Sequence, residues 1–156
     1  MAQKPSLNDL LEFQLQGDPL YMSNRLNSLG GWFARDVTGY KNKQTNYSWV
    51  NAVEGEDFDA YSRDEMSYRS FPKFKSVVIY VTVLRATFDN IMSSVKSSFI
   101  LDATLIDDPK VKQYKYSNVD TVLEIIEPFQ PQKNDNFLYV FIVYNKQDYN
   151  NGCKIN

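Results

Sequence analysis

The chain has 156 residues, of which 43% are hydrophobic and 15% aromatic, enough for the core of one domain or of two small subdomains. Its formal net charge of -2, with scattered basic residues, argues against binding to nucleic acid. Histidine is absent, which excludes Ser–His–Asp and Cys–His catalysis and histidine metal sites, and a single cysteine excludes a disulfide within the chain.

Two consecutive helices are predicted at the start of the chain. Ser6 with Asp9 forms a capping-box pattern, leucines follow at helical spacing, and Gly17 ends the helix. Asp18-Pro19 then supplies the N-cap and first residue of a second helix, which ends at Gly30.

Strands come next. Trp32–Val37 and Tyr47–Val53 predict an antiparallel hairpin. Glu54–Lys75 begins acidic, ends basic and contains aromatic residues throughout, so we interpret it as a long ordered loop or an irregular edge strand, a kind of segment that is often functional. Ser76–Leu84 is apolar at nearly every position, which is typical of a central strand.

The second half has a similar order. Thr87 is the expected N-cap of a helix, and Phe99–Ile106 the expected strand after it. Val111–Glu127 contains one bulged strand or two. Phe137–Tyr144 is the last predicted strand, and its apolar run again indicates a central position.

Asn24–Val53 and Asn90–Ile126 resemble each other, which suggests an internal repeat. The matched residues, at a constant spacing, are Leu26, Leu29 and Phe33 with Met92, Val95 and Phe99. The sum predicts an α+β fold: an antiparallel sheet of about six to seven strands with helices packed on one face, in two unequal tandem copies.

We expect a single α+β domain over residues 6–145, with copy one at about 6–84 and copy two at about 85–145. Residues 1–5 are predicted to be disordered, and residues 146–156 to form a frayed polar tail in which Cys153 is a surface thiol.

The acidic and aromatic segment after the hairpin is the candidate partner-binding site. Tyr and Phe beside carboxylates make an adhesive, anionic surface that would fit a cationic cleft of another protein. A solvated acidic loop and a calcium site are alternatives, although the EF-hand order is absent, and we predict no metal and no cofactor. The site residues are Glu54, Glu56, Asp57, Phe58, Asp59 and Tyr61.

Other aromatic residues follow the same segment or lie on the strands. The series continues through Tyr68, Phe71 and Phe74, either as part of the adhesive surface or as a cover for one edge of the sheet. Two alternating pairs, Tyr47 with Trp49 and Tyr114 with Tyr116, each share one strand face. Such rows can stack on ligands, but packing under the helices is the favoured interpretation.

From Ser6 to Tyr144 the order of elements resembles the beta-lactamase-inhibitor-protein and BamE-like arrangement. The resemblance implies helices packed on a small sheet in each copy, and binding to other proteins outside the cytoplasm. The start, Met-Ala-Gln-Lys-Pro-Ser, resembles the mature ends of exported Bacteroidetes proteins, so the expected location is the periplasm or cell envelope after signal-peptide removal, with the cytoplasm as the alternative.

The predicted function is a non-catalytic protein-binding module, an immunity or inhibitor protein that blocks a toxin or enzyme, as a monomer or weak homodimer with no membrane span. An envelope structural or assembly factor is the alternative. A third hypothesis is a carboxylate-dependent glycan hydrolase, for which Asp102 and Glu124 are the better candidates if they lie within roughly 5–10 Å of each other.

Overall fold

The computed structural model describes residues 3–39, 44–51, 64–128 and 138–155. The helices are α1 (Leu7–Gln16), α2 (Pro19–Leu29), α3 (Arg85–Ser98) and α4 (Lys146–Asn150). The strands are β1 (Trp32–Ala34), β2 (Thr38–Gly39), β3 (Thr45–Asn51), β4 (Asp64–Ser70), β5 (Val77–Thr82), β6 (Ile100–Asp107), β7 (Val111–Ser117), β8 (Thr121–Pro128) and β9 (Tyr139–Asn145).

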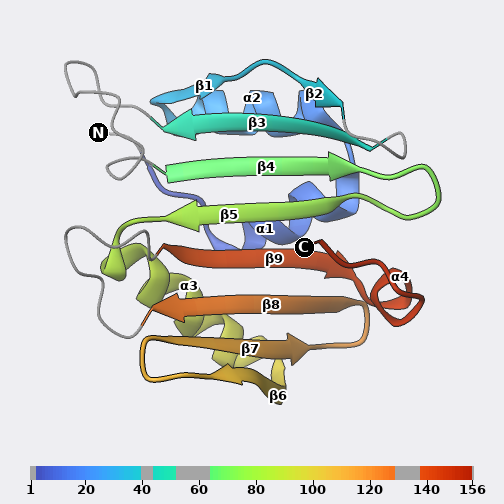
Figure 1. The fold of residues 1–156 in the computed structure, drawn as a ribbon. Coiled ribbons are helices and arrows are strands. Elements are labelled where there is room, and N and C mark those ends of the chain that lie inside the picture. Colours follow the sequence, from blue (N-terminus) through green and yellow to red (C-terminus); the bar gives the residue numbers. More distant parts are fainter. Residues whose placement is uncertain (1–2, 40–43, 52–63, 129–137, 156) are drawn as a thin grey trace.

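All these strands form one antiparallel sheet of nine strands in the order β1-β3-β4-β5-β9-β8-β7-β6, with β2 paired to β3 beside β1 (Figure 1). The predicted α+β class and antiparallel sheet are confirmed. Val111–Glu127 holds two strands, which was one of the two predicted alternatives. The sheet is larger than predicted because β2 follows the first expected strand, Trp32–Val37, and because β4 is a regular strand that the sequence did not predict.

The first two helices begin and end where the sequence predicts. In α1 the Asp9 carboxylate accepts from the Ser6 backbone N–H at 2.9 Å, while Ser6 Oγ accepts from the Asp9 N–H at 3.2 Å. Gly17 has a φ of 59°, a left-handed conformation that suits glycine at a helix end. The Asp18 carboxylate accepts from the Leu20 N–H at 3.0 Å and caps α2.

The start of α3 differs from the prediction. The helix begins at Arg85, with Leu84 at the N-cap and no side-chain cap, and Thr87 is a buried residue of its first turn. The apolar face of α3 packs against the sheet, since Phe88, Ile91 and Val95 are all buried.

Strand β4 corrects our interpretation of Glu54–Lys75 as a loop or edge strand for Asp64–Ser70, while residues 54–63 lie outside the described residues. It pairs along its length with β3 and β5 and is therefore an inner strand. Met66 and Tyr68 point to the buried side, whereas Glu65 and Arg69 lie on the other face. Because charged residues occupy the outer face of β4, the sequence does not show an apolar run that would indicate a strand.

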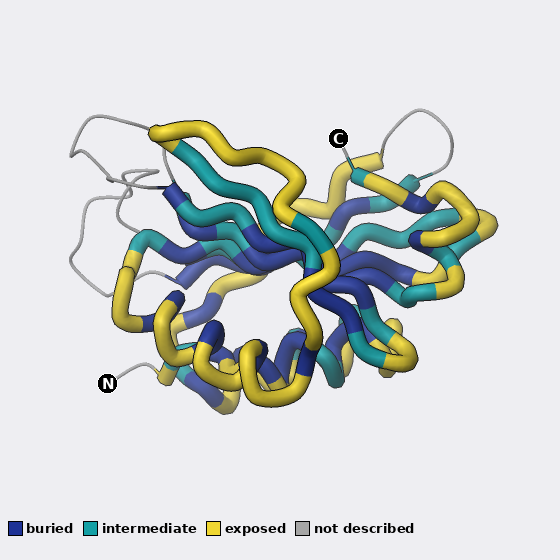
Figure 2. Tube along the Cα trace, turned by 90° about the horizontal axis from the view of Figure 1, so that it is seen from below, coloured by how far each residue is buried: buried dark blue, intermediate teal, exposed yellow. Residues whose placement is uncertain are grey.

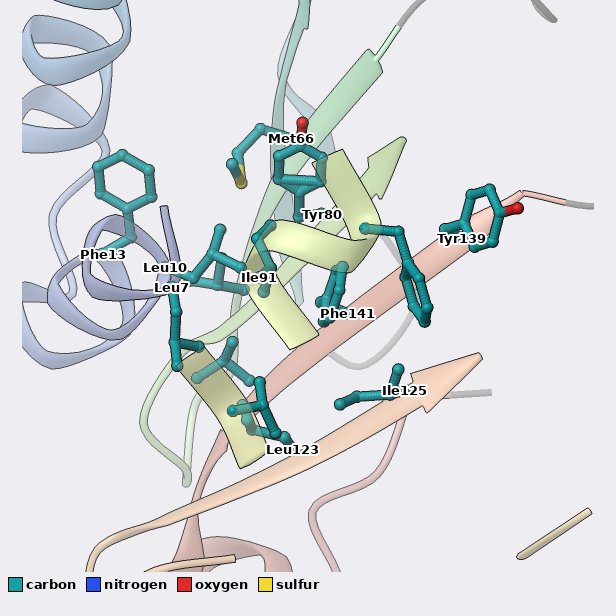
Figure 3. Packing of buried hydrophobic residues seen from close by; sticks show 14 of the residues in the cluster. Leu7, Leu10, Phe13, Met66, Tyr80, Ile91, Leu123, Ile125, Tyr139 and Phe141 are labelled. Atoms are coloured by element: carbon teal, nitrogen blue, oxygen red, sulfur yellow. The ribbon is translucent and has the colours of Figure 1, made fainter. Parts of the chain in front are cut away.

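Helices α1, α2 and α3 cover one face of the sheet and turn their buried sides toward it (Figure 2). The core between these layers is centred on rings of β5 and β9, with Tyr80 and Phe141 edge to face at 6.5 Å between ring centroids. Figure 3 shows Leu10 and Phe13 of α1 and Ile91 of α3 among the side chains that pack in this core.

The last helix lies on the opposite side of the sheet, which we call the α4 face. Tyr149 of α4 and the following Cys153 are buried there against Val122, Ile142 and Tyr144. The expectation that the helices share one face therefore does not hold for α4. The expected polar tail contains this helix, and the prediction of a surface thiol at Cys153 is wrong because the side chain is buried.

The described part of the N-terminus is also held in place. The Gln3 N–H donates to the Leu29 carbonyl at 2.9 Å, and Lys4 forms an ion pair with Asp64. Residues 3–5, which we predicted to be disordered, are thus tied to α2 and β4.

Each half of the sheet is a meander that follows a helix. Strands β1, β3, β4 and β5 follow α2, and strands β6, β7, β8 and β9 follow α3, so that β5 and β9 meet at the centre. The matched pair Leu29 and Val95 is buried in both helices, but Phe33 is exposed whereas Phe99 is buried. The two phenylalanines therefore match in sequence but differ in burial.

We predict that Leu123→Ala lowers the free energy of unfolding by about 2–5 kcal/mol, because Leu123 is fully buried in the core and its truncation leaves a cavity. Val119→Ala is the control, since Val119 is 87% exposed in a turn and its truncation should change stability by less than about 0.5 kcal/mol. Urea denaturation measures both, and equal effects would contradict the assigned core.

Candidate functional site

The predicted partner-binding residues lie in the stretch 52–63, outside the described residues; they are Glu54, Glu56, Asp57, Phe58, Asp59 and Tyr61. The strands on either side of this stretch are in register up to their last pair, Asn51 with Asp64. The two points at which the acidic segment joins the sheet are therefore neighbours across β3 and β4.

Asp64, the first residue after that segment, is the centre of a buried polar network. Its side chain is 1% exposed and accepts hydrogen bonds from Tyr80 Oη at 2.6 Å, Thr82 Oγ1 at 3.0 Å and the Val83 N–H at 3.3 Å. Lys4 Nζ lies 3.1 Å from the same carboxylate. Burial, and then the Asp64 charge, raise the pKa of Tyr80. The network fixes the start of β4 to the end of β5 and to the N-terminal segment.

The described members of the aromatic series pack on the sheet. Tyr68 donates from Oη to the Gly17 carbonyl at 2.8 Å, which closes the end of α1 onto β4. Phe71 and Phe74 meet edge to face at 6.4 Å and pack against the apolar cluster of the α4 face. These three rings therefore pack on or beside the inner strand β4 and do not cover one of the described edges of the sheet.

The aromatic rows on the strands pack under the helices, as predicted. Trp49 and Tyr116 are buried, and Tyr47 and Tyr114 are partly buried against the same core. Trp49 Nε1 donates to Ser23 Oγ of α2 at 3.1 Å. The rings therefore belong to the sheet–helix interface.

The two carboxylates considered for hydrolysis have different environments. Glu124 is buried under α4, where it accepts from Tyr149 Oη at 2.7 Å and from Gln113 Nε2 at 3.3 Å. Two ammonium groups lie over the Tyr149 ring, with Lys115 Nζ at 5.1 Å and Lys154 Nζ at 5.0 Å from its centroid. Asp102 is exposed on β6. Glu124 thus attaches α4 to the sheet.

The most exposed apolar segment on the described surface is strand β6, and we had not predicted it as a site. Ile100 is 74% exposed, Leu101 48%, Leu105 44% and Ile106 44%. The eight residues of β6 pair with β7 on one side, and the strand forms one edge of the described sheet. Long apolar edge strands are sites at which another chain can pair.

The opposite edge of the sheet differs. It consists of β1, with three residues, and β2, with two. Between them the Arg35 N–H donates to the Ser48 carbonyl at 2.8 Å. Short and interrupted edge strands offer few aligned backbone groups to another strand. Of the two described edges, β6 is the one suited to binding.

Exposed β6 continues into a partly apolar row across the α4 face. Cross-strand neighbours lie on the same face, and the register joins Ile106 to Gln113, Gln113 to Ile126, Ile126 to Val140 and Val140 to Val81. The four inner residues of this row are half-buried. Strand β6 is therefore the margin of a wider apolar surface.

Searches for metal sites, membrane spans and related proteins do little to narrow the possible functions. Within residues 3–39, 44–51, 64–128 and 138–155, no group of three or more acidic or cysteine side chains is placed to hold a metal ion. No described helix is long and apolar enough to cross a membrane. Comparisons with protein-family models, curated proteins and solved structures give no match to this chain.

We predict that Asp64→Asn lowers the free energy of unfolding by about 1–3 kcal/mol, because an amide lacks the charge that pairs with Lys4 and leaves buried donors poorly matched. Asp89→Asn is the control: Asp89 pairs with Arg85 on the exposed side of α3 at 3.0 Å, and its change should stay below about 0.5 kcal/mol. A chemical denaturation series separates the two, and an Asp64→Asn protein as stable as the control variant would contradict the assigned network.

We also predict that stability decreases at alkaline pH. Burial raises the pKa of the Cys153 thiol from 9.0 to about 11 and raises the pKa of Tyr80, Tyr144 and Tyr149 above 10.0. A raised pKa favours the folded state below the unfolded-state value, and that contribution is lost as the pH rises through the folded-state value. The free energy of unfolding should therefore fall above about pH 9, first through Cys153 and then through the tyrosines.

Urea denaturation at several alkaline pH values, with Cys153→Ala as the comparison, measures this effect. In the variant, the part of the fall in the free energy of unfolding that begins near pH 9 should be absent. Identical slopes in the two proteins, or a flat profile, would contradict the buried position of the thiol.

Proposed function

We propose that this protein is a non-catalytic protein-binding module of the inhibitor or immunity type, which acts by occupying the surface of a toxin or enzyme. The observation that supports this proposal best is the concentration of exposed large apolar side chains on one edge strand, with Ile100, Leu101, Leu105 and Ile106 within eight residues. Exposed apolar surface of this kind marks sites of association.

The scaffold supports the same proposal. One continuous antiparallel ladder runs from β1 to β6, and α1, α2 and α3 back one of its faces. An edge held in this way is ordered before a partner arrives, so association costs little conformational entropy.

The acidic segment is the second proposed contact area, formed by Glu54, Glu56, Asp57, Phe58, Asp59 and Tyr61. Its attachment points on β3 and β4 are separated from β6 by β5, β9, β8 and β7. The two areas can therefore be tested separately, and a partner that uses both would have to extend along most of the sheet.

An envelope structural or assembly factor is the second candidate function, and the same β6 edge favours it, because constitutive assemblies also use exposed strands. The hydrolase hypothesis has less support, since Glu124 is engaged by Tyr149 and Gln113 beneath α4.

We also propose that the two halves of the chain are unequal tandem copies, in keeping with the resemblance to the beta-lactamase-inhibitor-protein and BamE-like arrangement. The support is the shared order of a helix and a four-strand meander, and the central contact between β5 and β9.

Capture of partners from the lysate and secreted fraction of the source organism tests the function. We predict that the unmodified protein retains one stoichiometric partner, that Leu101→Lys with Ile106→Lys releases it, and that Val119→Lys, a change at a more exposed apolar residue in the β7–β8 turn, does not. Charge reversal at Glu56, Asp57 and Asp59 should weaken capture and flatten its salt dependence if the acidic segment contributes.

The readouts separate the candidate functions. Release at moderate salt and loss of the partner's activity on binding support the inhibitor, whereas a complex that survives high salt supports the assembly factor. If all variants, including the unmodified protein, retain the same partners to the same extent, or none, protein binding through these surfaces is wrong.

A further inference from the structure

We propose that β6 binds an extended segment of its partner by strand addition, and that this segment carries apolar residues together with a Lys or Arg that faces Asp102. The inference rests on the proposed protein-binding function and names the partner's chemistry at that site.

The backbone of β6 provides the first argument. Within the described chain, β6 has eight residues, pairs with β7 alone and forms one edge of the sheet (Figure 1), so the backbone groups on its outer side have no neighbouring strand there. An added strand satisfies such groups with main-chain hydrogen bonds, and side-chain pockets then give specificity.

The side chains of β6 provide the second argument. The register shifts twice, between Leu101 and Ala103 and between Thr104 and Ile106, so each shift leaves one extra residue on β6. As a result Ile100 and Ile106 pair with β7 residues of the α4 face, whereas Leu101 pairs with Tyr116 of the helix-covered face. A strand added here would find exposed apolar groups on both faces of the sheet.

The charge of β6 indicates which kind of partner segment would bind it. The strand contains Asp102 and Asp107 and no basic residue. Asp107 lies 3.7 Å from Lys112, but Asp102, the extra residue of the first shift, forms no ion pair or hydrogen bond within the described part of the chain. An unpaired carboxylate between apolar neighbours matches a cationic residue in an otherwise apolar segment.

A second copy of this chain is a poorer occupant. Antiparallel pairing of two β6 strands about Ala103 and Thr104 would set each Asp102 opposite a Leu105 and bring four aspartates, Asp102 and Asp107 of each copy, to one seam without a base on either strand. The aspartates would not lie directly opposite one another, but both Asp102 carboxylates would stand at the seam without a cation from the other copy's strand, so a second copy lacks the matching charge. The occupant is therefore a segment of a different protein.

Two synthetic eight-residue peptides test the proposal directly, one that alternates valine with lysine and one that alternates valine with glutamate. We expect the lysine peptide to bind the full chain, with amide chemical-shift changes and slowed hydrogen exchange on β6 and β7 only. The glutamate peptide should bind at least about tenfold more weakly at low salt.

Two charge changes of equal size form the matched comparison. Asp102→Lys should lower the affinity for the lysine peptide by about tenfold or more and raise the affinity for the glutamate peptide. Asp36→Lys changes an exposed position at the other edge of the sheet and should leave both affinities unchanged. Far-UV circular dichroism checks that both variants are folded.

Several results would overturn strand addition. They are equal binding of both peptides, shift changes away from β6, no binding at all, and dimerisation of the free chain that Ile106→Lys abolishes, which would identify a second copy as the occupant. If the natural partner is still captured while neither peptide binds, the protein-binding function stands and this mode of binding is wrong.

Discussion

The contact between β5 and β9 is the constraint on which the rest of the structure depends. These strands pair from Val78 with Val143 to Thr82 with Tyr139 and join the two halves into one sheet. Both are apolar on their two faces, because the helical layer buries Tyr80 and Phe141 on one side and α4 covers Tyr144 on the other. A centre that is buried on its helix-covered face and partly covered on the α4 face accounts for the long apolar runs of these strands.

This central pairing determines which strands form the edges. Because each half is a meander that ends at the centre, the strand directly after each helix becomes the outermost, namely β1 after α2 and β6 after α3. The two edges then differ in protection. β1 is short and β2 continues it irregularly, whereas β6 is a full strand. The asymmetry between the halves thus leaves β6 as the one long edge strand of the described sheet.

Local signals made much of this fold predictable. The caps at Ser6 and Asp18 and the runs of β5 and β9 act within a few residues and were read correctly. Strand β4 was missed because its outward face is charged, and α4 because it has five residues and depends on a long-range bond from Tyr149 to Glu124. The exposure of β6 could not be predicted, since it follows from the order of strands and not from local sequence. The predicted acidic site stays a prediction.

The two register shifts of β6, and an Asp102 that has no partner among the described residues, are features that usually protect an edge from unwanted pairing, because bulges bend the strand and an unmatched charge is costly to bury. The same features can confer selectivity. A partner segment with a cation removes the electrostatic penalty at Asp102, while an apolar or acidic segment, including β6 of another copy, retains it. Discrimination by this route requires no deep pocket. It requires a rigid edge, exposed apolar contacts at Ile100 and Ile106, and one charge that only the correct partner neutralises.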